Sequence, residues 1–240
     1  MKEALQYLVG LGKLDQIKLD DGRLYTDKSA VPVKADIVSP VDVETLCGFV
    51  DLLGCDVGAY KSQQTAILVE SFETVKLISL LADIWGRRQI FVVASCPKST
   101  GLRFGSWYDP ETFVIVLQSC FAPTPGREYL TRLASSLSAE GKVQIEDDGI
   151  TQRVTVKRGV QLKGEEEVAS RVSLAPFRTF REITQPSSDF VFRFKSGSEG
   201  ELPTCALFEA DGGAWRIQAV QLIASWLRNS LGDSGIPIVA

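Results

Sequence analysis

The spacing of apolar residues is helical over much of the first half of the chain. Helices are expected at residues 3–14, from Ser39 through Leu53, at 72–85, at 110–121 and around 129–137. Two continuous apolar runs, at 65–71 and 89–95, flank the 72–85 segment and predict buried strands. Strand, helix and strand in this order predict a crossover unit.

After residue 141 the pattern changes to the alternation that is typical of strands. A hairpin is predicted at 142–159 around Asp148–Gly149, and further strands are predicted at 172–180, 189–196, 204–210 and 236–240. A long helix is expected from the end of the 204–210 strand to about Asn229. The fold class that follows is α+β, with a mixed, largely antiparallel sheet, packed helices and one or two strand-helix-strand units.

The domain organisation is predicted from these elements. Residues 1–36 form an arm with a short helix and a hairpin around Asp21–Gly22. An arm this small buries little surface alone, so it either packs on the body or pairs with another subunit. Residues 37–240 form the body, with room for a sub-division near residue 140, where an α-rich half gives way to a β-rich half. Residues 54–62 superficially resemble a phosphate-binding loop, but their glycine spacing is wrong, so a connecting loop is expected.

Composition excludes several kinds of chemistry. The 240-residue chain has no histidine, which removes Ser-His-Asp and Cys-His catalysis and imidazole metal ligands. Its five cysteines are scattered, with neither a disulfide framework nor a zinc spacing. A net charge of −4 argues against nucleic-acid binding over the whole surface but leaves a local basic face open. No long apolar run is present. We expect a soluble, non-enzymatic, cytoplasmic protein without a cofactor.

The stretch FEADGGAWRI joins a predicted strand to the long C-terminal helix. Asp211 is expected to cap this helix, Gly212 and Gly213 to make the tight turn before it, and Trp215 to clamp its first turn on the body. The alternative is a ligand site. Its candidate residues are Glu209, Asp211, Gly212, Gly213 and Trp215.

A metal site is a weaker alternative at the same place. Glu70 follows an earlier strand, so Glu70, Glu209 and Asp211 would form a carboxylate site for a hard metal ion if the two segments met. The sequence does not show that they meet, and no metal site is predicted. A carboxylate-dependent metal enzyme remains an alternative function.

Residues 175–195 interleave phenylalanines with cations, as single-stranded nucleic-acid platforms do. Because Phe190, Phe192 and Phe194 point to one side of a strand, they are expected to be core, which leaves a basic outer face. The candidate nucleic-acid residues are Arg153, Lys157, Arg178, Arg181, Arg193 and Lys195. The aromatic run RFGSWYDPETF, residues 103–113, is expected to staple the start of the next helix.

Several phrases together are similar to a family of phage and prophage proteins of unknown function and, more distantly, to the YfdQ-like group. They are LCGFVDLL, RFGSWYDPETFVIVLQSCF, DDGITQRVTVKRGV, LAPFRTFREITQPSSDFVFRF, ALFEADGGAW and IPIVA. The resemblance implies a phage-encoded protein acting inside the infected host cell, and it supplies no catalytic residues. We therefore expect a homo-oligomeric binding protein that acts on a host protein or sequesters a small ligand, with a single-stranded DNA accessory role as the main alternative.

Overall fold

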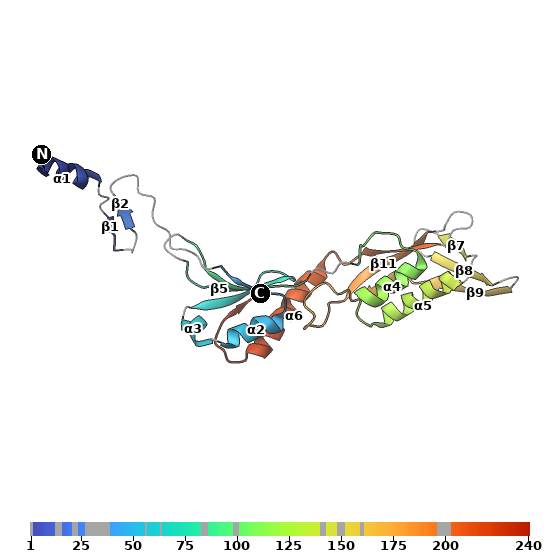
Figure 1. The fold of residues 1–240 in the computed structure, drawn as a ribbon. Helices are drawn as coiled ribbons and strands as arrows, with labels where there is room; N and C mark the ends of the chain where they lie inside the picture. The colour runs from blue at the N-terminus through green and yellow to red at the C-terminus, as the bar shows by residue number, and fades with distance from the viewer. Residues whose placement is uncertain are drawn as a thin grey trace.

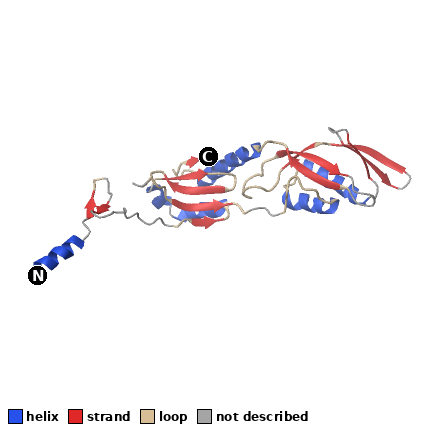
Figure 2. Ribbon diagram, turned by 90° about the horizontal axis from the view of Figure 1, so that it is seen from above, coloured by secondary structure: helices blue, strands red, loops and turns tan. Residues whose placement is uncertain are grey.

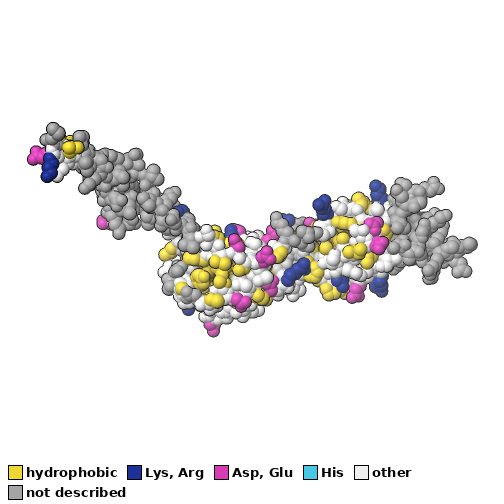
Figure 3. All heavy atoms as spheres, viewed as in Figure 1, with side chains coloured by type: hydrophobic (Ala, Val, Ile, Leu, Met, Phe, Trp, Pro, Cys, Tyr) yellow, Lys and Arg dark blue, Asp and Glu magenta, His cyan; other side chains and the backbone are white. Residues whose placement is uncertain are grey.

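The fold contains two hydrophobic cores, which lie next to each other along the long axis of the molecule (Figures 1 and 2). Figure 3 shows that acidic, basic and hydrophobic side chains are mixed over the visible face of the described residues. The computed structural model describes residues 2–12, 16–20, 24–26, 39–55, 57–62, 64–82, 86–97, 101–139, 143–147, 152–158, 161–195 and 203–240. Helices and mixed sheets are combined as the sequence predicts, so the α+β class is confirmed. No described helix is long and apolar enough to cross a membrane.

The first core lies between a five-stranded sheet and two helices. The strands, in the order β13-β4-β5-β6-β3, are Ile238–Val239, Thr65–Val69, Thr74–Ser79, Ile90–Ser95 and Val41–Val43. Strands β4, β5 and β6 are antiparallel to one another, whereas both edge strands pair in parallel. Helices α2 (Leu46–Cys55) and α6 (Ala214–Leu231) cover one face of this sheet (Figure 1). The C-terminal segment therefore completes a sheet that begins nearly 200 residues earlier in the chain.

The predicted helix at 72–85 is wrong. Residues Thr74–Ser79 form β5, which pairs antiparallel with both β4 and β6. Val75 and Leu77 are fully buried at a spacing of two, whereas Leu81, which the helical pattern would bury, is 69 % exposed. The β-branched residues of this segment fit a strand better than a helix. The predicted crossover is therefore a meander, and the true strand-helix-strand connection runs from β3 through α2 to β4.

Two other predicted boundaries are also wrong. The helix expected to open at Ser39 begins at Leu46, where the Thr45 side chain accepts a hydrogen bond from the Gly48 N–H at 3.0 Å. The residues just after Ser39 form β3 instead, because they pair with β6. The expected connecting loop at 54–62 contains a short helix, α3 (Val57–Ser62).

The second core lies between two helices and a three-stranded antiparallel sheet. The strands, in the order β10-β11-β12, are Arg171–Leu174, Ser188–Lys195 and Thr204–Glu209, and the helices are α4 (Pro110–Cys120) and α5 (Pro125–Ala139). Phe190, Phe192 and Phe194 are all buried in this core, as the alternation predicts. The Phe113 and Phe192 rings stack with their centroids 5.6 Å apart. Of the strand predicted at 172–180, only residues 172–174 are regular strand, within β10.

The boundary between the cores is not near residue 140. Phe113 and Leu130, which precede that position, share the second core with Phe190 and Phe192, which follow it. Up to residue 97 the described core residues belong to the first core, and from residue 102 they contribute to the second. The chain returns to the first core at Phe180 and Ile183, contributes β11 and β12 to the second core, and returns again with α6. Helices and strands on either side of residue 140 need each other to bury their apolar faces, so the predicted sub-division does not separate folding units.

The remaining elements lie at the two ends of the molecule in Figure 1. Helix α1 (Lys2–Gly12) and the antiparallel pair β1 (Gln16–Lys18) and β2 (Leu24–Thr26) confirm the helix and hairpin of the arm. A separate sheet contains β7 (Val143–Asp147), β8 (Gln152–Arg158) and β9 (Gln161–Val168). Its first two strands form the predicted hairpin, whereas β9 was not predicted. The turn residues of both hairpins, including Gly22, Asp148 and Gly149, lie outside the described residues.

Asp109 caps helix α4 and supports a first testable prediction. Its Oδ1 accepts a hydrogen bond from the Thr112 N–H at 2.9 Å, and the bonds from Thr112 hold the pKa of Asp109 below its ordinary value of 3.8. We expect Asp109→Ala to lower the free energy of unfolding by about 1 kcal/mol at neutral pH. Because the folded-state pKa is lowered, the cap stabilises above pH 3.8 and is lost as the pH falls through the folded-state pKa. Urea unfolding of both proteins from neutral to acidic pH should show the difference vanishing in acid.

Asp109→Asn is the matched control, since it keeps an acceptor oxygen but cannot titrate. At neutral pH the free energy of unfolding of Asp109→Asn should be close to that of wild type. As the pH falls, this variant should not show the loss of stability that protonation of Asp109 causes in wild type. A wild-type advantage over Asp109→Ala that persists unchanged well below pH 3.8 would contradict the assignment.

Candidate binding site

The glycine turn between β12 and α6 forms as the sequence predicts, but the N-cap residue of α6 is Gly213, which has no side chain to cap the helix, rather than Asp211. Gly212 and Gly213 have φ angles of +62° and +83°, a left-handed conformation that glycine adopts without strain. Asp211 accepts hydrogen bonds from the Gly213 N–H at 3.0 Å and from the Trp215 N–H at 3.4 Å. Partial burial acts to raise the pKa of Asp211, but these bonds, Ser188 and the charge of Arg178 outweigh it, so the pKa is lowered. Asp211 is thus committed to the first turn of α6.

Trp215 is buried and packs against the tip of the β4–β5 hairpin. Its ring lies edge-on to Phe72, with centroids 4.7 Å apart. The predicted clamp on the start of α6 is therefore present, and its partner on the body is Phe72.

A loop at residues 176–187, here called the strap, connects the two cores. Thr179 Oγ1 donates a hydrogen bond to the Phe72 carbonyl at 2.5 Å. Glu182 Oε1 accepts from the backbone N–H of Leu46 at 2.7 Å and of Cys47 at 3.2 Å, so it caps helix α2 from across the chain. Phe180 and Ile183 of the strap are buried in the first core. The strap therefore holds the second core against the first.

The hairpin tip, the strap, residues 102–104 and the β12–α6 turn line an open pocket of about 310 Å³ between the two cores. This junction pocket is lined by Phe72, Glu73, Leu102, Phe104, Pro176, Phe177, Arg178, Glu209 and Trp215. Four of these side chains are aromatic rings, and they come from four separate segments of the chain. The pocket therefore forms only when both cores and the strap are in place.

Arg178 is the central polar group of the junction pocket. Its side chain is only 10 % exposed, and its guanidinium lies 3.7 Å from the centre of the Trp215 ring. It pairs with Glu209 at 2.5 Å and donates a hydrogen bond to the Ser188 hydroxyl. Burial lowers the pKa of Arg178 to about 10, although Glu209 and Asp211 act in the opposite direction. The guanidinium therefore stays charged at neutral pH, and Glu209 neutralises it.

The Nε atom of Arg178 is buried and has no hydrogen-bond partner among the described residues. A buried donor without a partner costs about 1–3 kcal/mol. The stacking on Trp215 and the Glu209 pair offset that cost.

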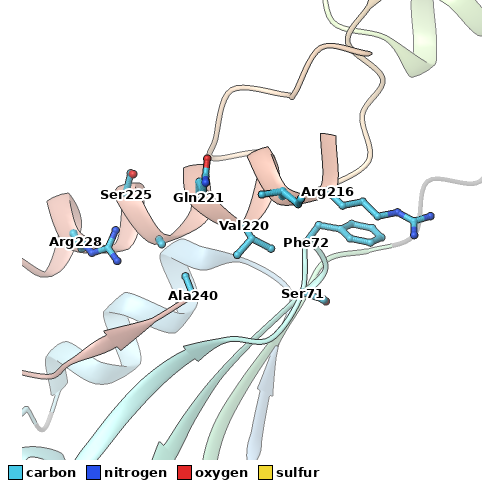
Figure 4. Close-up of a pocket in the computed structure, with 10 residues that line it drawn as sticks. Ser71, Phe72, Arg216, Val220, Gln221, Ser225, Arg228 and Ala240 are labelled. Atoms are coloured by element: carbon cyan, nitrogen blue, oxygen red, sulfur yellow. The ribbon is translucent and has the colours of Figure 1, made fainter. Parts of the chain in front are cut away.

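A second hollow of about 820 Å³ runs along α6 and shares Phe72 with the junction pocket (Figure 4). It is lined by Ser71, Phe72, Arg216, Ile217, Val220, Gln221, Ala224, Ser225, Arg228 and Ala240. In Figure 4, Arg216 extends along Phe72, and Val220 points toward the space beside Ala240. Ile217 is 67 % exposed, so this hollow is a shallow groove rather than an enclosed cavity.

Only some of the site residues predicted from the sequence lie in the junction pocket. Glu209 and Trp215 line the junction pocket, whereas Asp211, Gly212 and Gly213 build the turn beside it. Glu70 pairs instead with Lys76 at 2.5 Å. Among the described residues no group of three acidic, cysteine or histidine side chains could hold a metal ion.

The predicted nucleic-acid residues do not share one surface. Arg178 is buried in the junction pocket, and the Arg181 guanidinium lies over the Phe177 ring at 3.8 Å. Arg193 and Lys195 lie on β11, whereas Arg153 and Lys157 lie on β8 in a different sheet. Arg178 is therefore not available for the exposed basic face expected from these six residues.

Phe72, Phe104 and Phe177 line the pocket but were not identified as site residues from the sequence. Phe72 was placed in a helix by its spacing, although it lies in the turn between two strands. No local signal marks such residues, because their convergence depends on how the two cores meet.

Comparisons of the chain with protein-family models, with curated proteins and with solved structures found no match.

Proposed function

We propose that this chain is a non-enzymatic binding protein that holds a small, largely apolar ligand in the junction pocket. The observation that supports this most is the arrangement of four aromatic rings around one neutralised Arg178–Glu209 pair at the boundary between two cores. Ligand sites favour such boundaries and combine apolar walls with a few fixed polar groups. A volume of about 310 Å³ lies at the small end of the usual range for such sites.

The polar groups also indicate where the ligand's own polar group would lie. Glu209 is 38 % exposed at its side chain, so a carboxylate oxygen remains accessible to a hydrogen-bond donor of the ligand. Glu73 adds a second carboxylate to the lining of the pocket. Both carboxylates would repel an anionic ligand such as a phosphate. A neutral ligand, or one that donates hydrogen bonds, therefore fits the pocket better.

The sequence and the arm support a source, a cellular location and an oligomeric state for the protein. The resemblance to phage and prophage proteins supports a phage-encoded protein that works in the cytoplasm of the infected cell. The arm supports self-association, because the described side chains of α1 include the exposed Leu5 and Tyr7. A host protein as the bound partner is the alternative to a small ligand.

The test is native mass spectrometry of the protein after expression in bacterial cells. We expect a mass above the 26.3 kDa chain, or above a multiple of it, from a retained small molecule. Phe177→Ala removes one wall of the pocket and should weaken retention about tenfold or more, since a buried phenyl ring contributes about 1.5–3 kcal/mol.

Ile115→Ala is the control, because Ile115 is 59 % exposed on α4 and lies outside the pocket. Circular dichroism should show that both variants are folded. Retention that is equal in Phe177→Ala and wild type, or a spectrum containing only the bare chain mass, would overturn the ligand proposal. A spectrum containing only monomer would overturn the self-association separately.

A further inference from the structure

The three-stranded sheet of the second core has a face that α4 and α5 do not cover. In β11, Phe190, Phe192 and Phe194 point toward the helices, so Asp189, Val191, Arg193 and Lys195 point the other way. In β12 the register places Phe208 opposite Val191, on that same side. We call this side, with its neighbours on β10, the outer sheet face.

Residues 105–108 extend this sheet beyond β12. The Tyr108 and Cys205 backbones exchange hydrogen bonds of 2.9 and 2.8 Å, and the Gly105 N–H donates to the Leu207 carbonyl at 2.8 Å. Tyr108 is opposite Cys205 and packs on the second core, so Trp107 falls on the outer sheet face, opposite Ala206. Alanine at that position leaves room for the large ring.

Trp107 and Phe208 form an exposed aromatic pair on the outer sheet face. Their ring centroids are 6.3 Å apart, with 73° between the planes. Trp107 is 44 % exposed and Phe208 is 37 % exposed, whereas the phenylalanines of the opposite face are buried. Single exposed apolar side chains are common on protein surfaces, whereas neighbouring exposed rings form a contiguous apolar patch of the kind that binding sites use.

Cations lie on the same face of the sheet as this pair. Arg171 on β10 is in register with Val191, which is itself opposite Phe208, and Lys195 lies farther along β11. Arg171 and Lys195 are exposed, and Arg193 between them is half-buried. Asp189 is the one carboxylate on this side of β10, β11 and β12, and it lies at the end opposite Lys195. The outer sheet face is therefore basic although the whole chain carries a charge of −4.

We propose that the outer sheet face binds single-stranded nucleic acid, with bases stacked on Trp107 and Phe208 and phosphates held by Arg171 and Lys195. Exposed rings on a sheet stack on unpaired bases, and nearby cations follow the backbone. A duplex keeps its bases stacked on one another, so the aromatic pair favours a single strand. The partner chemistry differs from that of the junction pocket, and this proposal does not depend on it.

The experiment is fluorescence anisotropy of a labelled single-stranded oligothymidylate titrated with the full chain. Binding is expected at about 50 mM salt and should weaken with a slope near −1.4 in log affinity against log salt, for about two phosphate contacts. Trp107→Ala and Phe208→Ala should each weaken binding by about 5-fold or more, as expected for the loss of one stacked base. Arg171→Ser with Lys195→Ser should bring the salt slope close to zero.

Two matched controls keep the test specific. Arg132→Ser removes an exposed cation from α5, on the other side of the sheet, and Ile115→Ala removes an exposed apolar side chain from α4. Both should bind like wild type, and thermal unfolding should show that all variants are folded. No anisotropy change with wild type, equal affinity for a duplex of the same length, or unchanged affinity in both aromatic variants would overturn the proposal.

Discussion

Phe192→Ala is expected to lower the free energy of unfolding by about 3–5 kcal/mol, the usual cost of removing a fully buried phenylalanine ring. The Phe192 ring stacks on Phe113 at 5.6 Å and lies 4.5 Å from Phe194, edge to face. These rings come from α4 and β11, so the cavity would lie where the helices meet the sheet. Because whole domains are stabilised by only about 5–15 kcal/mol, this loss should be large enough to populate an unfolded second core.

Urea denaturation followed by circular dichroism measures this effect. Phe208→Ala is the matched control, because it removes the same ring from the neighbouring strand but from the exposed side. It should change the free energy of unfolding by less than about 1 kcal/mol. Similar losses in the two variants would mean that the assignment of inner and outer faces is wrong.

Gln185→Leu should cost about 2–4 kcal/mol, since it removes every polar contact of a buried amide and leaves four backbone groups without partners. Gln185 is 8 % exposed. Its Oε1 accepts from the backbone N–H of Arg178 at 3.1 Å and of Thr179 at 3.4 Å. Its Nε2 donates to the carbonyls of Phe180 at 2.9 Å and Ile183 at 3.2 Å. The amide therefore holds the strap in its folded shape.

The same substitution should loosen the junction pocket, because Arg178 and Phe177 belong to the strap. Thermal unfolding measures the stability, and native mass spectrometry measures ligand retention in the same preparation. Gln118→Leu, on the exposed side of α4, is the control for the change from amide to leucine and should alter the stability by less than about 0.5 kcal/mol. A loss in Gln185→Leu no larger than in Gln118→Leu would show that the strap does not depend on this amide.

The turn at Glu209–Trp215 shows how far local sequence reasoning reaches. Two glycines after an aspartate, followed by an apolar helix, require left-handed backbone and a carboxylate that accepts the first N–H groups, and the structure has both. The start of α4 is equally local, because Asp109 accepts the Thr112 N–H and Pro110 lies in the first turn. These features depend on neighbours within a few residues, which the sequence lists in order.

The segment 72–85 shows where that reasoning fails. Its apolar residues fit a helical spacing and a strand spacing about equally well, and pairing with β4 and β6 decided the outcome. The start of α2 was misplaced for the same reason, because residues 41–43 are a strand only through their pairing with β6. Strand pairing is a long-range interaction, so local propensity cannot decide it.

By itself the sequence determined the α+β class, the buried side of β11 and the turn before α6, because alternation, capping and glycine conformation are local properties of the chain. Only the tertiary structure decided that two cores form, that Glu182 caps a helix 136 residues earlier and that Arg178 lies on Trp215. The junction pocket and the exposed Trp107–Phe208 pair belong to this second group. Both arise from contacts between segments that are far apart in the chain. The free energy of such contacts depends on how much surface the segments bury against one another, which local sequence does not determine.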